Sequence, residues 1–161
     1  MLTVMIVASP VGPLHLYADA EALVGLYLHE RSAPPAVERH SPLLVRAAGQ
    51  LADYFAGRRI AFDLPLAPGG TAFQARVWSA LVRIPYGATR SYGALAASIG
   101  RPAASRAVGA ANGRNPISIV IPCHRLIGST GDLTGYGGGL AAKRWLLDHE
   151  RAHADRIRHR R

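Results

Sequence analysis

The 161-residue sequence contains one cysteine, Cys123, and one lysine, Lys143. A single thiol excludes an internal disulfide and any zinc site built from several thiolates. No apolar run approaches the roughly 20 residues of a membrane-spanning helix, and the N-terminal residues lack the basic start and long apolar stretch of a secretory signal. We therefore expect a globular, cytoplasmic protein with no membrane association.

Acidic residues are missing from a long internal stretch, because none occurs between Asp63 and Asp132. Residues 71–161 contain fourteen basic residues against four acidic ones, within a net charge of +9 for the chain. Such a basic surface is typical of proteins that bind a polyanion. Coding bias would explain the preference for arginine over lysine, but it would not remove the acids.

A segment rich in proline and glycine, residues 64–71, coincides with this change in charge. Proline and glycine clusters of this kind mark turns and linkers. We therefore predict two domains, residues 1–68 and residues 69–161, of which the second ends in a basic tail.

The first domain is expected to be a small sheet with one helix. Apolar runs near residues 3–8, 14–18 and 23–28 are separated by turn residues, which predicts a three-stranded antiparallel meander. Apolar residues at helical spacing over 42–56 predict a helix that Gly57 ends.

The second domain is expected to be mostly helical. Thr71 can cap an amphipathic helix that ends at the Pro-Tyr-Gly turn of residues 85–87. Ser91 can cap a short helix over 91–99, and Pro102 can open another over 102–113. Two short helices with a glycine turn indicate a helix-turn-helix, although a helical hairpin in a protein core would show the same spacing.

The second of these short helices carries one large side chain, Arg106, among alanines, glycines and a serine. Small residues let a helix approach a partner closely, and a lone cation protrudes from such a face. This pattern favours DNA contact. Tight helix packing with a solvated arginine is the alternative.

The surroundings of Cys123 suit a nucleophile. The mostly apolar run over 117–121 predicts a buried strand that ends just before it, and a neighbouring base or cation favours the reactive thiolate. His124 and Arg125 are the candidates for that base or cation. Adjacent side chains point to opposite faces of a strand, so contact between Cys123 and His124 requires a turn or a bridging water. An inert buried thiol is the alternative.

A glycine-rich loop follows and leads into a helix predicted from about Leu140 to Arg151. The loop lacks the Gly-Lys-Ser/Thr of a P-loop, so we do not expect nucleotide binding. His153 and the basic residues 156–161 are expected to be solvated and mobile.

The stretch over 91–150 closely resembles the O6-alkylguanine-DNA alkyltransferases. The resemblance rests on Pro-Cys-His-Arg at residues 122–125, on the Asn-Pro pair and aliphatic run before it, and on the Gly-Tyr and repeated glycines after it. It is strong over 71–150 and looser in the first domain, at SPVGPL and YFAGRR. It implies an α+β fold, in which a ribonuclease H-like domain with an antiparallel sheet and a helix precedes a mostly helical, winged-helix-like domain with a helix-turn-helix.

The resemblance further implies DNA repair, in which Cys123 irreversibly takes the alkyl group from O6 of guanine and is consumed. Acceptance of O4-alkylthymine stays open. His124 would act as the base through a bridging water, Glu150 would orient His124, and Asn115 would connect the site to the helix-turn-helix. Arg106 would enter the base stack where the target nucleotide leaves, and Tyr92 would assist flipping.

Further residues receive roles from the same resemblance. The other expected DNA contacts are Ser91, Ala104, Ala107 and Ser129. The alkylguanine pocket would be formed by Tyr92, Tyr136, Gly137 and Leu126. No metal or cofactor is implied.

The expected partner is double-stranded DNA containing O6-alkylguanine, bound by a protein that is monomeric in solution, with cooperative binding on DNA left open. The sequence lacks the zinc-site cysteines of some relatives and the regulatory domain of the adaptive-response members, which favours a protein dedicated to repair. Two other interpretations remain. The protein could be a non-catalytic module that binds damaged DNA, or a cysteine hydrolase that turns over repeatedly.

Overall fold

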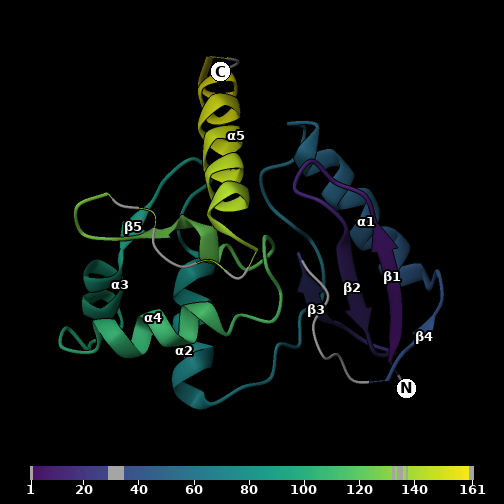
Figure 1. The fold of residues 1–161 in the computed structure, drawn as a ribbon, viewed down its shortest axis with the longest axis horizontal. Coiled ribbons are helices and arrows are strands. Elements are labelled where there is room, and N and C mark those ends of the chain that lie inside the picture. The colour runs from purple at the N-terminus through teal and green to yellow at the C-terminus, as the bar shows by residue number, and fades with distance from the viewer. Residues whose placement is uncertain (1, 29–34, 132, 134–135, 137, 160–161) are drawn as a thin grey trace. The chain divides into compact units, whose positions relative to one another are not determined.

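The computed structural model describes residues 2–28, 35–131, 133, 136 and 138–159. The chain divides into two compact units, drawn in Figure 1. The first comprises residues 1–69 with 116–118, and the second comprises residues 70–115 with 119–161. A short segment from the middle of the second half of the chain therefore belongs to the first unit. No helix among the described residues is long and apolar enough to cross a membrane.

The first unit is a four-stranded sheet in the order β3-β2-β1-β4 with one helix. Its elements are β1 (Thr3–Val7), β2 (Leu14–Ala18), β3 (Leu23–Tyr27), β4 (Val37–Glu38) and α1 (Pro42–Phe55). The first three strands form the expected antiparallel meander, and β4 adds a short parallel pairing to β1. Alternate residues of β2 are fully buried, as the two-residue period of a strand requires, and α1 contacts β1 and β2.

The second unit holds four helices, a 3-10 turn and a two-stranded parallel pairing among its described residues. These are α2 (Ala72–Val82), β5 (Arg90–Ser91), α3 (Tyr92–Ser98), α4 (Ser105–Gly113), η1 (Cys123–Arg125), β6 (Leu126–Ile127) and α5 (Leu140–His159). Two predicted N-caps are confirmed, since Thr71 accepts from the Gln74 N–H at 3.1 Å and Ser91 from the Ala94 N–H at 3.0 Å. The α+β class is confirmed.

The predicted strand over residues 117–121 is wrong. Ile117 makes an isolated parallel bridge to Leu26 of β3, and the chain turns immediately afterwards. Ile119 has φ of 71°, in the left-handed region that a β-branched residue rarely adopts and that a strand cannot contain. The apolar character of the segment therefore reflects burial rather than strand geometry.

Two predicted helix boundaries also need correction. The helix after Pro102 begins only at Ser105, because residues 101–104 close a turn in which the Ala104 N–H donates to the Arg101 carbonyl at 2.9 Å. The last helix continues to His159, so residues 156–159 of the expected tail are helical, and residues 160–161 lie outside the described residues. No glycine or proline follows Arg151 to end the helix earlier.

Gly87 and Gly100 provide a matched test of how closely α5 packs within the second unit. Both have positive φ, 83° and 76°, so alanine is strained at either position. A Cβ at Gly87 would lie 2.6 Å from the Cβ of Ala154 on α5, whereas a Cβ at Gly100 would meet nothing within 4 Å. We expect Gly87→Ala to reduce the free energy of unfolding by about 1–3 kcal/mol more than Gly100→Ala, measured by urea denaturation. Equal losses would contradict the close packing of α5 at this turn.

Candidate active site

Cys123, His124 and Arg125 form the 3-10 turn η1. The Cys123 N–H donates to the Ile121 carbonyl at 2.8 Å, and the Arg125 N–H donates to the Pro122 carbonyl at 3.0 Å. The three side chains belong to residues that are 4%, 0% and 6% exposed, respectively. Because the segment is a turn and not a strand, its adjacent side chains need not point to opposite faces.

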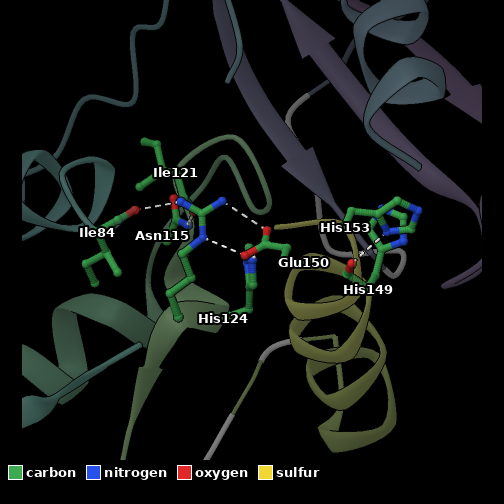
Figure 2. Close-up of polar contacts among 8 residues, drawn as sticks. Ile84, Asn115, Ile121, His124, His149, Glu150 and His153 are labelled. Carbon is green, nitrogen blue, oxygen red and sulfur yellow. Dashed lines mark hydrogen bonds and ion pairs between the residues drawn. The ribbon is translucent and has the colours of Figure 1, made fainter. Parts of the chain in front are cut away.

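Glu150 on α5 connects His124 with Arg125. Figure 2 shows the Glu150 carboxylate pointing toward His124, and its Oε2 lies 2.8 Å from His124 Nε2. Arg125 donates from Nε to Oε1 at 2.7 Å and from Nη2 to Oε2 at 3.0 Å. A further donation from Arg125 Nη1 reaches the Ile84 carbonyl at 2.7 Å. Glu150 is only 1% exposed, and its carboxylate is held by a bidentate guanidinium and an imidazole.

The electrostatics of Glu150 follow from these partners. Burial alone would raise its pKa, but the charge and hydrogen bond of His124, together with those of Arg125, outweigh burial and hold the pKa of Glu150 well below its usual range. An ionised carboxylate at Nε2 favours the His124 tautomer with its proton on that nitrogen. His124 Nδ1 is buried and makes no hydrogen bond to the described part of the chain. This nitrogen therefore has the lone pair that can take up a proton.

Lys143 is a member of the site that the sequence analysis missed. It is 0% exposed, and its Nζ donates to the Leu126 carbonyl at 2.7 Å. Burial lowers the pKa of Lys143, and the charge of a Cys123 thiolate opposes that shift. A cation that interacts with a thiolate favours its formation. A lysine in an amphipathic helix gives no sign of such a position, because most lysines there are solvated.

Two asparagines connect η1, the candidate reactive turn of Cys123, His124 and Arg125, to α4. Asn115 Nδ2 donates to the Ile121 carbonyl at 2.8 Å, and Asn112 Nδ2 donates to the Cys123 carbonyl at 3.4 Å. Both residues are buried. Asn115 was expected to lie here, whereas Asn112 was not. Its signal in the sequence was a polar residue near the C-terminal end of a helix otherwise rich in alanine and glycine.

Comparison with known protein families gives matches over both parts of the chain. Residues 72–152 match the model of the 6-O-methylguanine DNA methyltransferase DNA binding domain, and residues 3–68 match that of the ribonuclease-like domain of the same proteins. The chain belongs to the 6-O-methylguanine DNA methyltransferase family. The resemblance seen in the sequence is thereby confirmed.

Relatives in this family cover nearly the whole chain. The methylated-DNA–protein-cysteine methyltransferase of Mycobacterium tuberculosis H37Rv is 50% identical over 149 residues, 91% of this chain and 90% of the relative. That of Methanosarcina acetivorans is 49% identical over 148 residues, 88% of this chain and 94% of the relative. The crystal structure of M. tuberculosis OGT in complex with DNA matches with a TM-score of 0.89 at 48% identity, covering 94% of each chain.

The residues expected to contact DNA, except Ser129, lie on or beside α3 and α4. Arg106 and Ala107 are exposed on α4, and Ala104 precedes that helix. The Ser91 hydroxyl caps α3. Tyr92 begins α3, and its ring lies 3.5 Å from where a Cβ at Gly109 of α4 would be, which places the ring in van der Waals range of that helix.

The remaining predicted residues follow η1. Leu126 is fully buried, and Ser129 is exposed in a turn. Tyr136 is half-buried, and Gly137 lies outside the described residues. His153 was expected to be solvated, but it is half-buried, and its Nδ1–H donates to the His149 carbonyl at 2.8 Å (Figure 2). The sequence analysis ended this helix at about Arg151, so it left His153 outside the helical turn that brings its ring to the His149 carbonyl.

Because the pKa of Glu150 is lowered in the folded chain, the stability of the fold should depend on pH in the acid range. Because the carboxylate is more acidic in the folded chain than its ordinary 4.5, its contribution is complete above that pH and is lost as the pH falls through the folded-state value. We expect the thermal midpoint of the wild type to fall progressively below pH 4.5. At neutral pH, Glu150→Gln should cost about 3–5 kcal/mol, because Arg125 is left buried without its counter-charge.

Thermal unfolding by circular dichroism between pH 2 and pH 7 checks this expectation. Asp148→Asn is the matched control, because Asp148 is an exposed carboxylate on the same helix, 66% accessible at its side chain. The Glu150→Gln curve should be flatter in acid than the curves of the wild type and the control. Three parallel curves would show that Glu150 is not the group that titrates.

Proposed function

We propose that this protein repairs alkylated DNA by moving the alkyl group from O6 of guanine onto Sγ of Cys123, once per molecule. The observation that supports this most directly is the sequence of groups at η1: a buried thiol, a neighbouring imidazole, and a carboxylate 2.8 Å from the far nitrogen of that imidazole. In a family of methylated-DNA–protein-cysteine methyltransferases, such a set can generate a thiolate at neutral pH.

The chemical step is an in-line displacement. His124 Nδ1 takes the thiol proton, directly or through one water, and Glu150 stabilises the imidazolium that forms. The thiolate attacks the alkyl carbon, the C–O bond breaks with its electron pair going to guanine, and a proton from the protein restores neutral guanine. Neither a metal nor a cofactor is needed to balance this step. A thioether is a poor leaving group, so Cys123 stays alkylated.

Access to the target base is proposed to require flipping. Arg106 projects from α4 among small residues, and it forms no ion pair with any described residue. A side chain inserted from the minor groove can occupy the space of an extruded base, at an unstacking cost of about a few kcal/mol. Tyr92, packed against α4 at Gly109, is then placed to assist the extruded nucleotide.

Intact-protein mass spectrometry tests the chemistry. The wild type, mixed with an excess of duplex carrying one O6-methylguanine, should gain one methyl group per protein, and peptide mapping should place it on Cys123. Cys123→Ser should bind the same duplex and gain nothing. An unmethylated duplex is the substrate control.

The two other interpretations give different results in this experiment. A damage-binding module would bind the duplex without any change in protein mass and would leave the lesion in place. A cysteine hydrolase would consume substrate beyond one equivalent and return to its original mass.

Arg106→Ala separates base flipping from alkyl transfer. We expect the rate of repair of duplex DNA to fall about 10- to 100-fold, which corresponds to an unstacking cost of a few kcal/mol, with a much smaller effect on free O6-alkylguanine. Single-turnover rates on both substrates measure the difference. Arg114→Ala, which removes another exposed arginine of the same unit, is the matched control. Equal losses on both substrates would argue against the flipping role.

A further inference from the structure

The basic stretch between Asp63 and Asp132 holds more arginine than the proposed mechanism uses. Arg125 is buried against Glu150, and Arg106 has a role at the base stack. Five others are exposed and form no ion pair with any residue that the structure describes: Arg76, Arg83, Arg90, Arg101 and Arg114. They are five of the fourteen basic residues within residues 71–161.

Two of these arginines line the same groove between α2 and α3. The groove has a volume of about 530 Å³ and is lined by Ala75, Arg76, Ser79, Arg83, Ser98 and Ile99. Arg76 and Arg83 are seven residues apart, so they project from one side of the helix axis with a rise of about 10 Å between them. Ser79 lies between them. None of the described residues that line the groove is acidic.

Arg76 also donates a hydrogen bond to the carbonyl of Ile99, which is the C-cap residue of α3. A helix C-terminus carries partial negative charge and would repel an anion. The guanidinium offsets that charge, and its remaining N–H groups are available for another acceptor. The groove is therefore basic even where a helix ends in it.

We propose that this α2–α3 groove binds phosphate groups of the DNA backbone, as an anchoring site additional to α4. Guanidinium groups bind phosphate oxygens through paired hydrogen bonds, and serine hydroxyls can add further donors. Cations about 10 Å apart suit the repeated charges of a DNA strand better than the single phosphate cluster of a nucleotide. Among the described residues that line the groove, Ala75 and Ile99 are the only apolar ones that could contact a base.

The inference rests on the proposed function for the identity of the partner, but it involves no residue of the reactive turn. The groove and α4 belong to the same compact unit, and α2 contacts both α3 and α4. Phosphate contacts fix the register of a protein on a duplex without reading its sequence. Contacts in the groove would accordingly help to set where Arg106 meets the base stack.

The salt dependence of DNA affinity tests the groove. Affinity for a duplex carrying one O6-methylguanine is measured by fluorescence anisotropy across a series of salt concentrations for the wild type, Arg83→Gln and Arg151→Gln. Arg151→Gln is the matched control, because it removes the same charge from an exposed position of the same unit outside the groove. We expect Arg83→Gln to lower the slope of log K against log salt by about 1, and the control to leave it unchanged.

A second measurement locates the contact. Phosphates along both strands are replaced one at a time by neutral methylphosphonates, and affinity is measured for the wild type and Arg83→Gln. At the contacted phosphate the wild type should lose affinity severalfold, whereas Arg83→Gln should show little additional loss, because the interaction is already absent. Equal sensitivity of both proteins at every phosphate, or equal slopes for Arg83→Gln and Arg151→Gln, would overturn the proposal.

Failure of the groove proposal can be distinguished from failure of the proposed function. Alkyl transfer to Cys123 is followed in the wild type by mass spectrometry with free O6-alkylguanine, which has no backbone phosphate. Absence of transfer there would overturn the repair chemistry while leaving the salt slopes interpretable. Transfer to Cys123 together with unchanged slopes would retain the repair chemistry and overturn the groove.

Discussion

The buried carboxylate of Glu150 holds the reactive turn of this protein against its last helix. Removing an ionised carboxylate from water costs several kcal/mol, and here the cost is offset by His124 and by the two-point contact with Arg125. The same contacts fix the imidazole, so the stability of this turn and the proposed chemistry depend on one group. They also require α5 to be placed accurately, which the close approach of Gly87 to Ala154 helps to achieve.

Helix α4 links the proposed DNA surface to the thiol. Its exposed side presents Arg106 among small residues, while its inner side buries Val108, Ala111 and Asn112. The indole N–H of Trp78 donates to the Ala111 carbonyl at 2.9 Å, which fixes α4 on α2. Asn112 then reaches the carbonyl of Cys123 itself. Under the proposed function, this one helix would connect the side chain at the base stack with the backbone of the thiol.

Local signals explain which elements were predictable. The caps at Thr71 and Ser91 and the meander of the first unit depend on residues close together in sequence, and they are present as expected. The mostly apolar residues 117–121 led to the wrong prediction of a strand, because a buried turn and a buried strand have similar composition. Ile117 pairs with Leu26 of β3, 91 residues earlier, and the chain then turns at Ile119, which has a positive φ.

The sequence by itself determined the family, the thiol with an imidazole beside it, and the acid-free basic stretch. The resemblance also pointed to Glu150, but not to its second partner. Only the tertiary structure decided that Arg125 shares the carboxylate with His124, that Lys143 is buried on the Leu126 carbonyl, and that Arg76 and Arg83 line one groove. Long charged side chains have no intrinsic preference among distant partners, so their roles depend on which backbone and charges the packed helices bring within reach.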